Sequence, residues 1–162
     1  MAQEQNVIQI LELAVETERR ARRIYLEAAE NAKDAVTASV FEALADDELE
    51  HERIIVEFWK AVEHNAEWAE DNIDASLTKP AEGRIKDILA RCEASASDDI
   101  NLMQVYETAA NFERDTRDFY KEQAELAKDV RAKRFFTFLT IFEDIHLAML
   151  DYFIDRSNIR PN

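Results

Sequence analysis

Residues that break helices are nearly absent from this chain. Between Met1 and Arg160 it contains one glycine, Gly83, and one proline, Pro80, and the two lie close together. The sequence on either side of this pair can therefore stay helical over long stretches. Of its 162 residues 47% are hydrophobic and 34% charged, and no apolar run reaches the roughly 18 residues that a membrane-spanning helix needs. The sequence predicts an all-α protein, and its length fits a single domain over residues 1–162.

Four long segments repeat apolar residues at alternating steps of three and four, the period of an amphipathic helix. We expect helices over about residues 6–32, 35–68, 98–127 and 130–155. Each would form a rod of roughly 40 Å. The segment 69–97, which holds the proline and the glycine, is expected to be a long crossover with one short helix. Such a connection can span a bundle, so the prediction is a four-helix bundle in which the second and third long helices need not form a hairpin.

The two halves of the chain repeat each other at an offset of 95 positions. Eleven of the 22 residues in 14–35 are identical to their counterparts in 109–130. The most informative matches are Glu18 with Glu113, Tyr25 with Tyr120, Glu48 with Glu143 and His51 with His146. Because these residue types recur at one fixed offset, the sequence predicts two related helical hairpins about a pseudo-twofold axis.

Six ionisable residues interrupt the apolar stripes at positions where the helical period predicts a side chain facing the core. They are Glu18, Glu48, His51, Glu113, Glu143 and His146. Each lies near the middle of its helix, so antiparallel packing should bring all six to the same height inside the bundle. The neighbouring acidic residues lie off the stripe and are expected to be solvated: Asp46, Asp47, Glu50 and Glu52. His64 has no glutamate three residues before it, and we expect it not to be a ligand.

Four carboxylates inside an apolar core need compensation, because buried carboxylates repel one another and become protonated. No lysine or arginine lies on the four stripes. Two divalent cations would balance the four negative charges, with two neutral histidines as further ligands. In a Glu-x-x-His pair both side chains share one helix face, so the carboxylate can bridge two ions while the imidazole binds one. Oxygen-rich ligands with one nitrogen per ion favour iron or manganese, and zinc could also occupy such a site.

Two tyrosines extend this pattern. Tyr25 and Tyr120 lie two helical turns after Glu18 and Glu113, on the same faces. Their hydroxyls could donate hydrogen bonds to metal-bound carboxylates from across the bundle and so support catalysis indirectly. The alternative is that they are core tyrosines with incidental partners, and the sequence leaves both interpretations open.

Together these residues resemble the di-iron site of the ferritin-like superfamily, particularly of its rubrerythrin and bacterioferritin members. The resemblance implies that two Fe ions are the cofactor. It implies terminal ligands at Glu18 and Glu113, bridging ligands at Glu48 and Glu143, and nitrogen ligands at His51 and His146. It further implies oxidation of the di-Fe(II) centre by hydrogen peroxide or dioxygen, which amounts to peroxide reduction or ferroxidase activity.

Three features separate this sequence from those relatives. Typical rubrerythrins carry an additional glutamate three residues after the position of Glu113, where this chain has Thr116, and the counterpart in the first half is Ala21. They also carry a rubredoxin domain, which needs four thiolates, whereas Cys92 is the one cysteine here. We therefore expect an external electron donor such as a rubredoxin-like protein. Bacterioferritins bind haem through a methionine after the first bridging glutamate, and Leu49 stands there, so no haem is predicted.

The predicted function is therefore that of a rubrerythrin-like oxidoreductase in oxidative-stress or iron handling. Two alternatives remain: a subunit of an iron-storing ferritin-type cage, and a helical interaction protein in which metal holds the bundle together without turnover. The net charge of −15 argues against nucleic acids and anionic membranes as partners. The N-terminal MAQEQN lacks the basic start and apolar stretch of a secretory signal, so we expect a cytoplasmic protein. We also expect a homo-oligomer, a dimer or larger.

Overall fold

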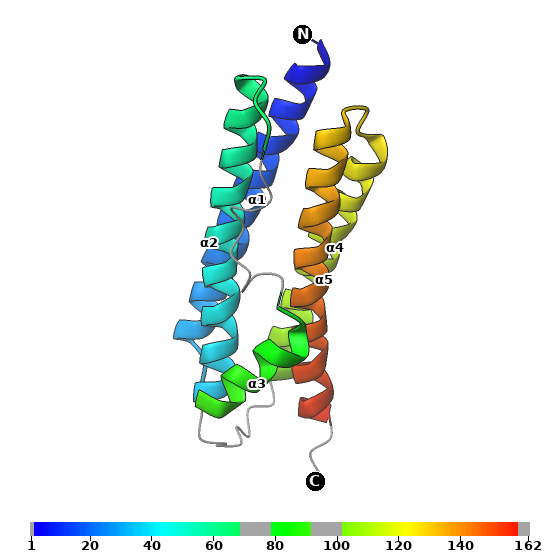
Figure 1. The fold of residues 1–162 in the computed structure, drawn as a ribbon. Helices are drawn as coiled ribbons and strands as arrows, with labels where there is room; N and C mark the ends of the chain where they lie inside the picture. The colour runs from blue at the N-terminus through cyan, green and yellow to red at the C-terminus, as the bar shows by residue number, and fades with distance from the viewer. Residues whose placement is uncertain (1, 69–78, 92–101, 159–162) are drawn as a thin grey trace.

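The computed structural model is all-α, and it describes residues 2–68, 79–91 and 102–158 (Figure 1). Within these ranges the helices are α1 (Ala2–Glu30), α2 (Ala35–Glu63), α3 (Ala81–Arg91), α4 (Leu102–Leu126) and α5 (Val130–Asn158). α1 and α2 form one antiparallel hairpin, α4 and α5 form another, and α3 lies across one end of the pair, against α2 and α5. The arrangement is consistent with a ferritin-like bundle and confirms the all-α class.

Most helix boundaries agree with the sequence prediction, and the end of α2 is the clearest difference. The prediction extended this helix to residue 68, whereas it ends at Glu63. Asn65 adopts a φ of 48°, and asparagine is one of the few residues besides glycine that enters this left-handed conformation readily, so the helix ends here. α3 confirms the short crossover helix. Residues 69–78 and 92–101, which include the predicted start of the third long helix, lie outside the described residues.

Both hairpin turns end in an aspartate that starts the next helix. Asp34 Oδ1 accepts a hydrogen bond of 2.9 Å from the backbone N–H of Thr37 at the start of α2. Its counterpart at the 95-residue offset is Asp129, whose Oδ1 accepts from the N–H groups of Arg131 at 2.7 Å and Ala132 at 3.3 Å. These N–H groups have no partner within the first turn of a helix, so the aspartates satisfy them. The sequence repeat thus includes the helix caps.

Replacing Asp34 by alanine is expected to lower the free energy of unfolding by about 1 kcal/mol, because the first turn of α2 would lose its side-chain acceptor. Urea unfolding of chelator-treated protein, followed by circular dichroism, measures the change. Asp46→Ala provides the control, since this residue is exposed on the same helix and its loss should cost less than about 0.5 kcal/mol. Equal losses in the two variants would contradict the capping role.

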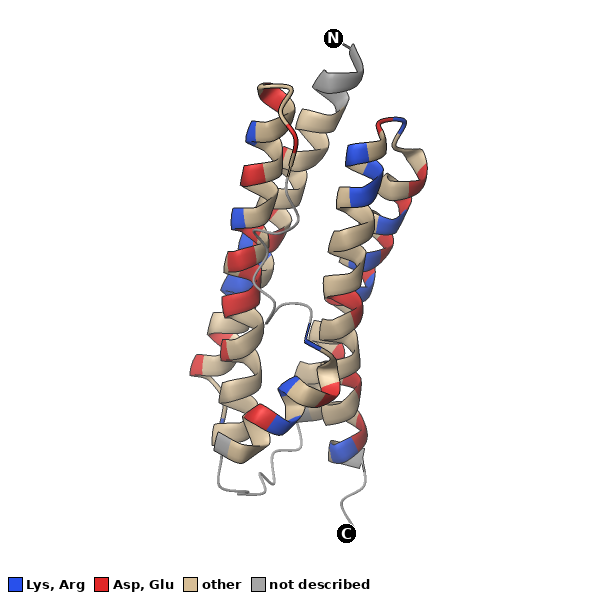
Figure 2. Cartoon of the chain, in the orientation of Figure 1, with Lys and Arg blue, Asp and Glu red and all other residues tan. Residues whose placement is uncertain are grey.

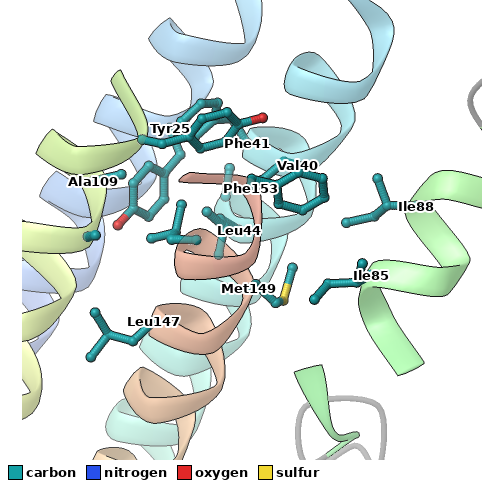
Figure 3. Close-up of a cluster of buried hydrophobic side chains, with 14 of the residues drawn as sticks. Tyr25, Val40, Phe41, Leu44, Ile85, Ile88, Ala109, Leu147, Met149 and Phe153 are labelled. Atoms are coloured by element: carbon teal, nitrogen blue, oxygen red, sulfur yellow. The ribbon is translucent and has the colours of Figure 1, made fainter. Parts of the chain in front are cut away.

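The buried apolar side chains among the described residues form two clusters, one toward each end of the bundle. The first includes Tyr25, Phe41 and Leu150, and Ile85 and Ile88 of α3 cover its side (Figure 3). The second includes residues of all four long helices: Leu11, Phe58, Tyr120, Phe136 and Leu139. The six predicted polar residues lie along each helix between these apolar clusters, which exclude water from both directions.

Charged side chains of both signs are interspersed along the long helices (Figure 2). Within the arginine-rich segment 19–23, Arg19 pairs with Glu52 at 2.7 Å and Arg23 with Glu16 at 3.4 Å. These arginines therefore lie on a solvated face with acidic partners. None of the helices in the described part of the chain is long and apolar enough to cross a membrane.

Candidate metal centre

The structure brings all six predicted polar residues together in the middle of the bundle. Each is 1% exposed: Glu18 of α1, Glu48 and His51 of α2, Glu113 of α4, and Glu143 and His146 of α5. The candidate ligand atoms of the two Glu-x-x-His pairs lie within 4.8 Å of one another. The imidazole rings of His51 and His146 stack with their centroids 5.1 Å apart. We call these six residues the cluster.

Both histidines direct Nδ1 toward the carboxylates. His51 Nδ1 lies 3.0 Å from Glu48 Oε2 and 3.4 Å from Glu18 Oε2. His146 Nδ1 lies 3.2 Å from Glu113 Oε1 and 3.4 Å from Glu143 Oε2. Each hairpin therefore contributes the same arrangement, in which a histidine contacts one glutamate on its own helix and one on the adjacent helix.

The two tyrosines connect the hairpins through these carboxylates. Tyr25 of α1 donates a hydrogen bond to Glu113 of α4, and Tyr120 of α4 donates one to Glu18 of α1. Burial and the nearby carboxylate charges raise the pKa of both phenols well above 10.0, so the hydroxyls keep their protons and act as donors. Each hydroxyl therefore reaches a glutamate of the opposite hairpin, as the first of the two interpretations left open by the sequence requires.

The four carboxyl groups separate into two pairs by pKa. Burial and the charge of Glu18 raise the pKa of Glu48 well above its ordinary value, and burial and the charge of Glu113 do the same for Glu143. Burial also opposes ionisation of Glu18 and Glu113, but a hydrogen bond with Glu48 helps to lower the pKa of Glu18, and the charge of His146 helps to lower that of Glu113 to about 2. With no cation bound, burial and the neighbouring charges therefore favour the protonated form at Glu48 and Glu143 and the ionised form at the other two.

The polar atoms of the cluster fit a cation better than they fit one another. Within the described residues, both carboxylate oxygens of Glu143 and Nδ1 of His146 are buried without a hydrogen-bond partner. An unsatisfied buried polar atom costs about 1–3 kcal/mol, a cost that a bound cation would remove. Carboxylate oxygens combined with imidazole nitrogens form the donor set that iron and manganese accept. The cluster is therefore able to hold metal.

Asp47 corrects the sequence analysis, which expected this residue to be solvated. It is 8% exposed, its Oδ2 lies 3.1 Å from Nε2 of His146, and it accepts a hydrogen bond from Arg84 of α3. Although burial opposes ionisation, the hydrogen bond with His146 and the charges of His146 and Arg84 lower the pKa of Asp47. The helical period could not show this, because Asp47 is buried by α5 and by the crossover helix rather than by its own hairpin. An aspartate directly before Glu-x-x-His was the only available signal.

Three other positions contribute no ligand atom to the cluster. His64 is exposed at the end of α2, where its Nδ1 lies 2.7 Å from the Lys60 carbonyl oxygen. Thr116 is buried, and its hydroxyl donates to the Phe112 carbonyl oxygen at 3.1 Å within α4. Ala21 is buried and has no polar side-chain atom. Neither half of the bundle therefore supplies a glutamate at the position where typical rubrerythrins carry an additional one.

Comparison with known proteins identifies the family. No curated protein and no solved structure matches the chain. The family model described as Rubrerythrin matches residues 9–154, a range that includes the whole cluster together with Asp47 and Arg84. Since this match covers most of the sequence and agrees with the buried Glu/His cluster, the chain belongs to the rubrerythrin family, a ferritin-like di-iron family.

Proposed function

We propose that this chain is a non-haem di-iron oxidoreductase, which binds two Fe ions in the cluster and oxidises them with hydrogen peroxide or dioxygen. The observation that carries the proposal is the burial of four glutamates and two histidines at 1% exposure each. Two divalent ions would balance the four carboxylate charges. Bound ferrous ions would supply two electrons, which with two protons reduce one hydrogen peroxide to two water molecules.

The orientation of Glu48 and Glu143 supports their assignment as bridging ligands. Glu48 Oε2 lies 3.0 Å from His51 Nδ1, and its Oε1 lies 3.5 Å from His146 Nδ1. Glu143 Oε2 lies 3.4 Å from His146 Nδ1, and its Oε1 lies 3.9 Å from His51 Nδ1. Each of these carboxylates therefore presents one oxygen to each half of the cluster, an orientation that would let it be shared by two ions.

Glu18 and Glu113 fit the role of terminal ligands. Glu18 lies near His51, and Glu113 lies near His146, so each serves one half of the cluster. The hydrogen bonds from Tyr120 and Tyr25 hold one oxygen of each carboxylate and leave the other lone pairs for an ion. The tyrosines are thus proposed to position the terminal carboxylates, and the apolar clusters on both sides keep bulk water away from them.

Iron content after anaerobic loading with Fe(II) and desalting tests the metal site. We expect about two Fe ions per chain, the stoichiometry of ferritin-like carboxylate bundles. The double variant Glu48→Ala/Glu143→Ala should lose them, because both proposed bridging ligands are removed. Glu42→Ala/Asp144→Ala is the matched control: it removes two exposed carboxylates from the same two helices and should retain the iron. A folded native chain that retains no iron would refute the proposal.

Oxidation of the loaded protein then separates the proposed activity from the alternatives. Rapid loss of Fe(II) after one equivalent of hydrogen peroxide or dioxygen supports an oxidoreductase. Retained iron that stays ferrous would favour a metal-stabilised interaction protein. Iron far above two per chain, in a large assembly on size-exclusion chromatography, would favour a storage cage. Turnover with a reduced rubredoxin-like protein would identify the class of electron donor.

A further inference from the structure

The pseudo-symmetry of the cluster is broken at the residue before each proposed bridging glutamate. Asp47 precedes Glu48, and its counterpart at the 95-residue offset is Phe142, which precedes Glu143. Each of the two contacts the histidine of the opposite hairpin. Asp47 Oδ2 lies 3.1 Å from Nε2 of His146, whereas the Phe142 ring stacks on that of His51 with centroids 4.6 Å apart and an interplanar angle of 7°. The same place in the fold therefore holds an anion in one half and an aromatic ring in the other.

This difference acts on the two imidazoles in different ways. A carboxylate that accepts a hydrogen bond from Nε2–H fixes the tautomer in which Nδ1 is free to bind a metal ion, and it makes that nitrogen more basic. Nδ1 of His146 is the atom directed at Glu113 and Glu143. Phe142 can fix the plane of the His51 ring, but it has no acceptor for an N–H group.

Arg84 supports Asp47 from the crossover. It forms an ion pair with Oδ2 of Asp47, and both side chains are largely buried. α3 is held in place by Ile85 and Ile88, which pack against Val40 and Met149 in the first apolar cluster (Figure 3). The chain from Arg84 through Asp47 to His146 consequently links the crossover helix to one half of the cluster.

We propose that Asp47 and Arg84 are positioning residues that make the two ion sites unequal, so that the half containing His146 and Glu113 binds a divalent ion more tightly than the half containing His51 and Glu18. This inference rests on the proposed di-metal function. It assigns the crossover helix a role in metal binding that the family resemblance does not supply.

Zinc titration of metal-free protein, followed by NMR of ¹⁵N-labelled histidine side chains, tests the inequality directly. Zn²⁺ is a suitable probe because it is diamagnetic and binds nitrogen and oxygen sites more strongly than Fe²⁺. The chain has three histidines, so His51→Asn and His64→Gln assign the signals. One equivalent of zinc is expected to shift the His146 signals first, and a second equivalent the His51 signals. If both histidines shift together in the native chain, the inference is wrong.

Three variants complete the test. Asp47→Asn should remove the preference for His146 and lower the affinity for the first zinc ion by about 10- to 100-fold in competition with a chelator. Arg84→Gln should act in the same direction to a smaller extent. Because it leaves Asp47 and all six cluster residues in place, it still tests the inference if Asp47→Asn folds poorly. Asp46→Asn makes the same chemical change on the exposed neighbour and should keep the native order.

The outcomes distinguish this inference from the proposed function. If zinc still shifts the His146 signals before those of His51 in folded Asp47→Asn and Arg84→Gln, or if these variants bind both zinc ions equally more weakly, the positioning role is wrong. The di-metal site would be unaffected by either result. A folded native chain in which neither histidine responds to two equivalents of zinc would instead overturn the metal site itself.

Discussion

Replacing Glu48 and Glu143 together by glutamine is expected to stabilise the metal-free protein at neutral and alkaline pH, although the variant should no longer bind metal tightly. Burial and the neighbouring carboxylate charges raise the pKa of both residues, so the folded chain retains two protons that the unfolded chain releases above its ordinary pKa of 4.5. Each retained proton lowers the free energy of unfolding by about 1.4 kcal/mol per pH unit as the pH rises. Glutamine is neutral at every pH and removes this loss.

His146 and Glu113 also contribute to the pH dependence of the stability of the metal-free protein. Burial lowers the pKa of His146, but the charge of Glu113 and the hydrogen bond with Asp47 outweigh it and raise this pKa well above 6.5. Its stabilising contribution is complete below pH 6.5 and is lost as the pH rises further, which steepens the decline. Glu113 has a pKa lowered to about 2, so its contribution is present above pH 4.5 and is lost on acidification toward that value. The metal-free chain should therefore be most stable in mildly acidic solution.

Urea unfolding in the presence of a chelator, at a series of values from about pH 5 to about pH 9, measures this dependence. The stability of the native chain should fall as the pH rises from 4.5 toward the raised pKa values of Glu48 and Glu143, and the double glutamine variant should keep only the fall due to His146, which begins near pH 6.5. Glu42→Gln/Glu125→Gln, which changes two exposed glutamates, should follow the native curve. A native stability that rises or stays level over this range would show that Glu48 and Glu143 do not retain protons in the folded chain.

The unfavourable burial of these carboxyl groups explains why the cluster could be predicted from the sequence. A glutamate on a core-facing stripe is unfavourable without a cation, so it stands out against the apolar period that surrounds it. Four such glutamates and two histidines at matching heights define one site. The sequence also suggested that the tyrosine hydroxyls could reach these glutamates, since they share a helix face with them and recur in the repeat, but it could not decide between this role and that of core tyrosines. These features depend only on residues within the four long helices and on their antiparallel packing.

The features that could not be predicted depend on relations between segments that the helical period does not encode. Asp47 lies one position off the stripe of α2, and its burial comes from α5 and from Arg84, which is 37 residues farther along the chain. The end of α2 at Glu63 depends on the backbone conformation of Asn65, although the apolar pattern continues to Trp68, which packs against the second apolar cluster. Local conformation and the position of the crossover therefore had to come from the structure.

Phenylalanine in place of Tyr120 is expected to destabilise the protein by about 1.5–3 kcal/mol, because a buried ionised carboxylate would lose a hydrogen-bond donor. Tyr120 is fully buried, and its hydroxyl donates to Glu18, whose pKa is lowered in part by this bond. Without the donor, the pKa of Glu18 should rise, and the carboxylate should be less well oriented toward an ion. We expect the affinity for Zn²⁺ to fall by about 10- to 100-fold, the range for lost partners of metal ligands. Tyr25→Phe should act in the same way through Glu113.

Tyr106 provides the matched control that decides between the two interpretations of these tyrosines. It is also buried, but its hydroxyl donates to the neutral oxygen of Thr37 at 3.2 Å, in the apolar cluster toward the α3 end of the bundle. Tyr106→Phe should cost about 0.5–1.5 kcal/mol and leave the zinc affinity unchanged. If Tyr120→Phe behaves in the same way as this control, in both urea unfolding and zinc competition, Tyr120 is a core residue with an incidental partner. If the zinc affinity instead falls in Tyr120→Phe and Tyr25→Phe but not in Tyr106→Phe, these two hydroxyls support metal binding because they donate to charged carboxylates, and not because they are buried.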